Sequence, residues 1–155
     1  MRKTILIAED TEGDRVLLRL GLEGGALPFS FRFVGDGQEA LEYLEGLGPF
    51  SDRARFPLPS LLITDIKMPR MDGLELLAWL RAQEAWKRMP VIVWTSSDLA
   101  NDREIAERCG ATAYVVKTYR IIPPTELVKA IRECTGVPGW QRDGPARPAR
   151  WHAGK

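Results

Sequence analysis

Five polar side chains that could act together on a phosphate group each follow an apolar run of this 155-residue chain. Glu9 and Asp10 follow the first run, Asp65 follows a later one, and Thr95 and Lys117 follow two more. If these runs are parallel strands, their carboxyl ends meet at the edge of the sheet where open α/β folds bind ligands. We therefore expect three carboxylates, a hydroxyl and an ammonium group to converge there.

This combination of groups predicts a particular chemistry. Carboxylates placed close together repel one another unless a cation lies among them. Oxygen ligands without histidine or cysteine favour Mg²⁺ over Zn²⁺. A lysine and a threonine opposite a carboxylate suit an anion whose charge the metal shares. We predict phosphoryl transfer to a carboxylate: Asp65 is the nucleophile, Mg²⁺ and Lys117 neutralise oxygens, and Thr95 hydrogen-bonds one.

Alternating strands and helices must position these groups. The strand candidates are continuous Val/Ile/Leu-rich runs, typical of strands buried on both faces: Thr4–Ala8, Ser30–Val34, Leu61–Thr64, Val91–Trp94 and Ala113–Val116. Segments with helical periodicity lie between them. The pattern predicts an α/β domain over residues 1–136, with a five-stranded parallel sheet and helices on both faces.

The helix starts and helix faces can be predicted locally. In the first helix, Val16, Leu17 and Leu20 share one face, which we expect to pack on the sheet. Thr11–Asp14 and Asp36–Glu39 have the pattern of capping boxes. Taken alone, Asp10 could also serve only as a helix cap.

Four stretches, in this order and at the strand ends, resemble the receiver domain of two-component response regulators across residues 3 to about 134. The stretches are Ile5–Asp10, Leu61–Gly73, Val93–Ser96 and Ala113–Lys117. The resemblance implies a flavodoxin-like, doubly wound sheet with strand order 2-1-3-4-5. It also implies a phosphoacceptor that is not an enzyme in the usual sense, and that takes phosphate from a histidine of a partner kinase.

The resemblance assigns the metal and phosphate roles residue by residue. Asp65 matches the phosphoacceptor, and Asp10 matches the direct Mg²⁺ ligand. Glu9 matches the acid that binds the ion through water, and the backbone carbonyl of Lys67 matches the third protein ligand.

The resemblance also implies a switch. Thr95 and Lys117 match the hydroxyl and the ammonium that contact the phosphoryl group. Tyr114 matches an aromatic residue that turns inward when the threonine moves toward the phosphate. Such a residue would be a two-state element biased by a local electrostatic event.

Three positions depart from the family pattern. Lys67 places a cation two residues after the nucleophile, where we expect it to alter the dephosphorylation rate. Thr118 stands where a proline is usual, so the peptide bond there is trans or strained, since a cis bond without proline costs about 3 kcal/mol. Tyr119–Pro124 is a few residues longer than usual and exposes Ile121 and Ile122, which makes a homodimer plausible.

The long Gly46–Ser60 loop, the Glu12–Asp14 helix start and the lack of an output domain resemble stand-alone regulators paired with bacterial phytochromes. The implied partners are a sensor histidine kinase of the bacteriophytochrome type and a downstream protein or phosphotransfer protein. No DNA-binding domain is expected.

Composition excludes several other classes. Residues 140–155 hold four basic side chains and one acidic one, whereas the remainder is mildly acidic, so strong nucleic-acid binding is not predicted. Residues 137–155 form a basic Pro/Gly-containing extension. Without an apolar stretch of about 18 residues we expect no membrane span and a cytoplasmic protein. Cys109 and Cys134 form no C-x-x-C pair, so we expect small apolar thiols and not a metal or redox site.

Two other functions stay open. A haloacid-dehalogenase-type phosphatase also forms an aspartyl phosphate, but it needs a second aspartate where this chain has Lys67 in Asp65-Ile66-Lys67. A phosphate-independent binding module would keep only the fold, which the presence of Asp10, Asp65, Thr95 and Lys117 disfavours.

Overall fold

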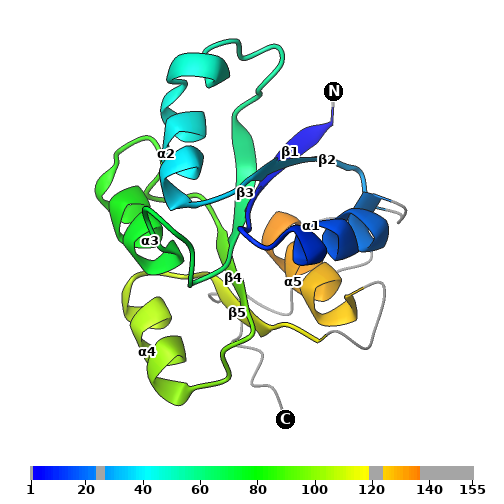
Figure 1. The fold of residues 1–155 in the computed structure, drawn as a ribbon, viewed down its shortest axis with the longest axis vertical. Helices are drawn as coiled ribbons and strands as arrows, with labels where there is room; N and C mark the ends of the chain where they lie inside the picture. Colours follow the sequence, from blue (N-terminus) through cyan, green and yellow to red (C-terminus); the bar gives the residue numbers. More distant parts are fainter. Residues whose placement is uncertain (1, 24–26, 119–123, 137–155) are drawn as a thin grey trace.

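A computed structural model describes residues 2–23, 27–118 and 124–136 as a single parallel sheet flanked by helices (Figure 1). The strands are β1 (Lys3–Ala8), β2 (Phe29–Val34), β3 (Pro59–Thr64), β4 (Val91–Thr95) and β5 (Ala113–Val116). Their order is β2-β1-β3-β4-β5, and every pairing is parallel. The predicted α/β fold and strand order are confirmed.

The helices cover both faces of the sheet. They are α1 (Glu12–Leu18), continued by a π-helical turn (Arg19–Glu23), α2 (Gly37–Glu45), α3 (Gly73–Ala82), α4 (Ala100–Arg108) and α5 (Thr125–Thr135). Helices α1 and α5 lie on one face, and α2, α3 and α4 lie on the other (Figure 1). Each face therefore has its own apolar core, one with Ile5 and Ile7 and the other with Leu6 and Ala8 of β1.

The predicted packing face of the first helix is wrong. Val16 and Leu20 are 48% and 64% exposed, whereas Leu18 and Leu22 are buried in the core below α5. Asp14 lies one turn before Leu18, on the same buried side of α1. The buried face is thus shifted by two residues from the predicted one. The prediction missed it because its first position is the polar residue Asp14.

The predicted cap at Thr11 is also wrong, whereas that at Asp36 forms. The Thr11 side chain makes no cap hydrogen bond, and the Thr11 N–H donates to Glu9 Oε1 at 3.1 Å. At α2, the Glu39 N–H donates to Asp36 Oδ1 at 2.8 Å. A complete capping box that the sequence analysis did not name joins Asp72 and Glu75 at the start of α3.

The predicted Gly46–Ser60 loop is a packed segment that ends at Leu58, because Pro59 and Ser60 already belong to β3. Tyr43 of α2 contacts the rings of Phe50 and Phe56, with centroids 5.2 and 5.9 Å away. The Arg53 guanidinium donates to the Tyr43 carbonyl at 2.7 Å and so caps the end of α2. The loop therefore extends the core on the α2 side of the sheet.

Some predictions fall outside the described residues. These are the Ile121 and Ile122 surface, most of the Tyr119–Pro124 segment, and the extension over residues 137–155. Within the described part of the chain, no helix combines the length and the apolar character that a membrane crossing requires.

Candidate functional site

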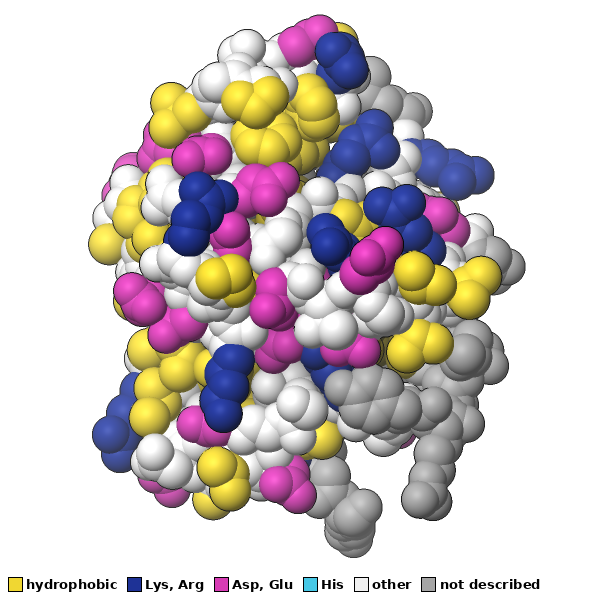
Figure 2. All heavy atoms as spheres, viewed as in Figure 1, with side chains coloured by type: hydrophobic (Ala, Val, Ile, Leu, Met, Phe, Trp, Pro, Cys, Tyr) yellow, Lys and Arg dark blue, Asp and Glu magenta, His cyan; other side chains and the backbone are white. Residues whose placement is uncertain are grey.

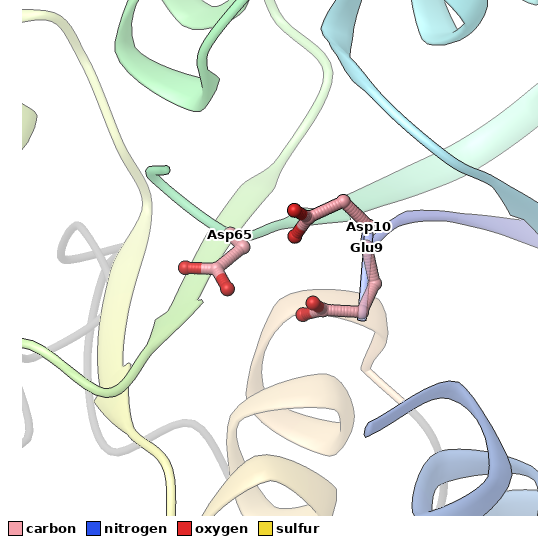
Figure 3. A group of neighbouring side chains, drawn as sticks. All are labelled: Glu9, Asp10 and Asp65. Atoms are coloured by element: carbon pink, nitrogen blue, oxygen red, sulfur yellow. The ribbon is translucent and has the colours of Figure 1, made fainter. Parts of the chain in front are cut away.

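Three carboxylates lie together at the carboxyl ends of β1 and β3 (Figure 3). Glu9, Asp10 and Asp65 each offer one oxygen, and these oxygens lie within 4.8 Å of one another. Glu9 and Asp65 are buried, whereas Asp10 is exposed. Figure 2, drawn from the same side as Figure 1, shows acidic side chains grouped near the middle of the molecule. The group is thus open to solvent through Asp10.

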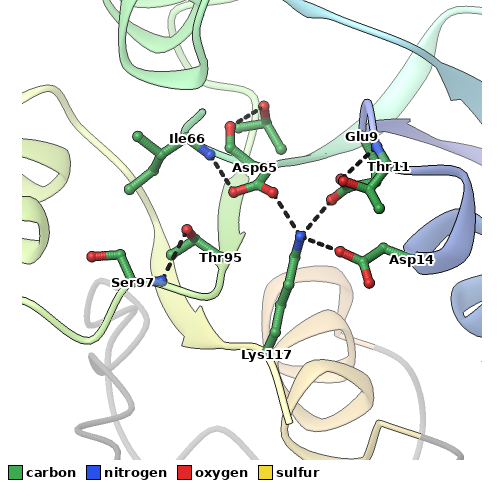
Figure 4. Close-up of polar contacts among 9 residues, drawn as sticks. Glu9, Thr11, Asp14, Asp65, Ile66, Thr95, Ser97 and Lys117 are labelled. Carbon is green, nitrogen blue, oxygen red and sulfur yellow. Dashed lines mark hydrogen bonds and ion pairs between the residues drawn. The ribbon is translucent and has the colours of Figure 1, made fainter. Parts of the chain in front are cut away.

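The Lys117 ammonium joins the buried acids from the end of β5 (Figure 4). Its Nζ lies 2.8 Å from Glu9 Oε2, 2.7 Å from Asp14 Oδ2 and 2.6 Å from Asp65 Oδ2. The side chain is 2% exposed, and the Trp94 ring lies 4.6 Å from Nζ. Lys117 is thus a buried cation whose polar partners are all carboxylates.

Burial and hydrogen bonding shift two of these groups. Burial raises the pKa of Glu9 to about 7, although the Lys117 and Thr11 hydrogen bonds oppose this. Burial alone would lower the pKa of Lys117, but hydrogen bonds to Asp14, Asp65 and Glu9 outweigh it and raise that pKa above its ordinary value. Lys117 therefore stays charged at neutral pH, while Glu9 can exchange a proton there.

Both oxygens of Asp65 are held. Oδ1 accepts from the Ile66 N–H at 2.7 Å, and Oδ2 accepts from Lys117. After Asp65 the chain turns back so closely that the Gly73 N–H donates to the Ile66 carbonyl at 2.7 Å. A Cβ at Gly73 would lie 1.8 Å from the Asp65 carbonyl oxygen, so only glycine fits here. This turn fixes Asp65 at the carboxyl end of β3.

The loop that follows Asp65 is attached to the start of α2. The Arg70 Nε donates to Asp36 Oδ2 at 2.9 Å, and the Gly37 N–H donates to the Met71 carbonyl at 3.0 Å. A Cβ at Gly37 would lie 2.4 Å from that carbonyl oxygen. The exposed Lys67 lies in this loop, and its assignment as a carbonyl ligand stays a prediction.

Thr95 and Tyr114 meet at the loop after β4. Thr95 is buried, and its Oγ1 accepts from the Ser97 N–H at 3.3 Å. Tyr114 is fully buried, and its hydroxyl donates to the Ser97 carbonyl at 2.8 Å. The Arg103 guanidinium lies 5.0 Å from the centre of the Tyr114 ring. Ser97 thus links the hydroxyl and the aromatic residue that the sequence pairs as a switch.

The acids suit a hard divalent cation. Glu9, Asp10 and Asp65 supply carboxylate oxygens alone, and one of the three is open to solvent. Within the described residues Asp10 forms no ion pair, so its carboxylate is available to an ion. This acidic group therefore implies a divalent cation at the carboxyl ends of β1 and β3.

Asp14 is the site residue that sequence reasoning missed. The sequence pattern places Asp14 in a predicted cap, but its carboxylate accepts a hydrogen bond from Lys117. The available signal was an acid one turn before Leu18, on the face that carries the buried Leu22. The incorrect face chosen for the helix hid that signal.

The chain is similar to a known protein family over most of its length. The response regulator receiver domain model matches residues 5–132. The chain therefore belongs to the response regulator receiver family, whose members are phosphoacceptors of two-component signalling and not classical enzymes. The described residues contain this receiver domain and no DNA-binding domain.

One relative of this chain has a metal-bound structure. Response regulator Rcp1 of Synechocystis sp. is 27% identical over 83% of this chain and 86% of its own length. Its Mn²⁺-bound structure, 26% identical, matches with a TM-score of 0.76 over 93% of this chain and 99% of that one.

Two further similar structures are those of phytochrome response regulators. The phosphorylated cyanobacterial phytochrome response regulator RcpA is 28% identical, with a TM-score of 0.75 over 86% of this chain and 93% of that one. The bacteriophytochrome response regulator RtBRR is 31% identical, with a TM-score of 0.74 over 96% of this chain and 84% of that one. This chain is thus similar to more than one phytochrome-linked response regulator.

Proposed function

We propose that Asp65 of this receiver accepts a phosphoryl group from a phosphohistidine of a sensor kinase. The observation that carries the proposal is the Lys117 ammonium 2.6 Å from Asp65 Oδ2, beside the acidic group at the end of β1. In the transfer, an Asp65 oxygen bonds to phosphorus as the phosphorus–nitrogen bond breaks, and the released imidazole nitrogen takes up a proton.

The residues around Asp65 prepare this step. The Ile66 N–H holds Oδ1, so the carboxylate keeps one orientation toward the donor. Lys117 supplies a buried positive charge next to the position where phosphoryl oxygens gather. Preorganised charge of this kind is the main contribution a protein makes to phosphoryl transfer. The chain thus supplies orientation and charge, and the chemistry is that of the phosphohistidine.

Mg²⁺ is the divalent cation we propose for the acidic group. Asp10 and Asp65 would bind it directly, Glu9 through water, and the Lys67 carbonyl would complete the protein ligands. When bound, it neutralises negative charge on the phosphoryl oxygens. The oxygen-only donor set supports this choice, and Rcp1, a relative, has a Mn²⁺-bound structure.

The signal is proposed to leave through Thr95 and Tyr114. A phosphoryl group on Asp65 offers Thr95 Oγ1 a stronger acceptor than its present surroundings do. Movement of Thr95 would alter the Ser97 segment, whose carbonyl holds the Tyr114 hydroxyl. Partner affinity then depends on how the β4–α4 loop and Tyr114 are arranged.

The kinase is proposed to be a bacteriophytochrome in the cytoplasm. Support comes from the similarity to the phytochrome response regulators RcpA and RtBRR. The downstream partner is proposed to be a protein target or a phosphotransfer protein. Co-purification of a kinase with this chain, followed by transfer of labelled phosphate, tests the pairing.

The test of the phosphoacceptor is direct. Acetyl phosphate with Mg²⁺ should add one phosphate by intact mass to the wild-type protein. Asp65→Asn should abolish the label, whereas Asp52→Asn, an exposed loop aspartate, should be labelled as the wild type is. Undiminished labelling of Asp65→Asn would refute the assignment.

A further inference from the structure

Asp14 is a buried acid for which the proposed phosphotransfer has no role. It is 6% exposed, and its Oδ2 lies 2.7 Å from Lys117 Nζ. It is not part of the acidic group whose oxygens lie close enough to share an ion. Burying a charged group costs free energy, so its presence on the packed face of α1 needs a reason.

The geometry around Lys117 gives that reason. A lysine ammonium has three N–H donors, and here each meets a carboxylate oxygen: those of Glu9, Asp14 and Asp65 (Figure 4). The Trp94 ring lies against the ammonium as well. With two donors held by Glu9 and Asp14, the third is directed at Asp65.

We propose that Asp14 is a positioning residue for the phosphotransfer, because it fixes the Lys117 ammonium with one N–H directed at the phosphoacceptor. The inference rests on the proposed function, since it concerns the reaction at Asp65. Without Asp14 one donor is free, and the ammonium can move among Glu9, Asp65 and water. Loss of a fixed orientation slows a reaction that depends on placed charge.

Asp14 contributes both an acceptor and a negative charge, and two variants separate these effects. Asp14→Asn keeps an oxygen that accepts from Lys117 but removes the charge. Asp14→Ala removes both. Both variants lose the negative charge, so both repel the anionic phosphate donor less by the same amount. The ratio of their rates therefore reports only how well Lys117 is positioned.

The experiment measures initial phosphorylation rates with acetyl phosphate at saturating Mg²⁺, corrected for the folded fraction by circular dichroism. Asp14→Ala should be about tenfold slower than Asp14→Asn. The loss is smaller than the ~10²-fold that a 1 Å misplacement can cost, because Lys117 keeps its contacts with Glu9 and Asp65. Glu12→Ala, which removes an exposed acid from the same helix, should match the wild type. If Asp14→Ala folds poorly, Asp14→Leu serves instead, because leucine suits the packed face and also lacks an acceptor.

Equal rates for Asp14→Ala and Asp14→Asn would overturn the inference, as would an equal loss in Glu12→Ala. A wild-type protein that labels at Asp65 while these variants do not differ would leave the proposed function intact. Absence of label on the wild-type protein would overturn the proposed function, and this inference with it.

Discussion

Two cations, the buried Lys117 and the half-buried Arg81, lie at different ends of the fold and have different hydrogen-bond partners. Lys117 is surrounded by carboxylates at the carboxyl ends of the strands. Arg81, at the end of α3, donates to backbone carbonyls: that of Gly110 at 2.8 Å and that of Met89 at 2.7 Å. Hydrogen bonding raises the pKa of Lys117 against the effect of burial, whereas burial lowers the pKa of Arg81.

The difference separates a functional cation from a structural one. The carbonyls belong to the backbone between α3 and β4 (Met89) and between α4 and β5 (Gly110), so they cannot leave Arg81 unless these segments unfold. The bonds of Arg81 therefore do not respond to a ligand. The acids around Lys117 can instead bind a divalent ion or a phosphoryl group, and the ammonium can exchange one anion for another. The ion pairs of Lys117 are therefore the part of this fold that can respond to a ligand.

The largest expected effect comes from removing Lys117. In Lys117→Met three acids stay buried without their cation, and a broken buried ion pair costs about 3–5 kcal/mol. The free energy of unfolding by urea in EDTA should fall by that amount, and Mg²⁺ should restore part of it. Phosphorylation should also be lost.

The matched control is Lys87→Met. Lys87 pairs with Glu84 on the surface at 2.9 Å, with side chains 41% and 89% exposed. Exposed pairs contribute little to stability. Equal losses in Lys117→Met and Lys87→Met would contradict the distinction drawn for the buried site.

Removing Arg81 should lower stability without affecting the site. Hydrogen bonds to charged groups contribute about 1.5–3 kcal/mol, so Arg81→Met should lower the free energy of unfolding by about 2 kcal/mol. The loss should be the same in EDTA and in Mg²⁺, and phosphorylation per folded molecule should not change. Arg81→Lys should recover less than half, because an ammonium cannot reproduce the planar fork.

A Mg²⁺-dependent loss in Arg81→Met, or slower phosphorylation at equal folded fraction, would show that the two cations are coupled. The outcome would remove the basis for treating one as structural.

The strands and the site residues at their ends could be predicted, because both depend on local sequence. Continuous apolar runs mark buried strands, and the polar residue after each run lies at the edge of the sheet. The packing face of helix α4 could not be predicted in the same way. Ala106 is its one buried residue, so its sequence shows no apolar face. Asp14 could not be assigned because its partner, Lys117, lies far along the chain and meets it only in the folded protein.

A smaller effect is expected from the titration of Glu9. Burial raises its pKa from 4.5 to about 7, so protonated Glu9 is favoured in the folded, metal-free protein. Its contribution to stability is complete below its unfolded pKa and is lost as the pH rises through 7. Binding of Mg²⁺ requires the deprotonated form, so apparent affinity should fall about tenfold per pH unit below pH 7.

Calorimetry in buffers of different ionisation enthalpy measures this proton release. Near pH 6.5 wild-type protein should release a proton when it binds Mg²⁺. Glu9→Gln should bind more weakly and should lose most of the pH dependence. An unchanged pH dependence in Glu9→Gln would place the titrating proton on another group.

The smallest effect concerns a third cation, Arg70, which is paired with Asp36 but exposed. Its φ of 63° is in the left-handed region, which favours glycine. Arg70→Gly and Arg70→Ala both remove the exposed ion pair, which contributes little, but only glycine relieves the backbone. In urea unfolding, Arg70→Gly should therefore be close to the wild type and Arg70→Ala less stable. An equal loss of unfolding free energy in both variants, unchanged by salt or Mg²⁺, would contradict this expectation. It would mean that the exposed Arg70–Asp36 ion pair stabilises the loop as strongly as the buried ion pairs of Lys117 stabilise the site.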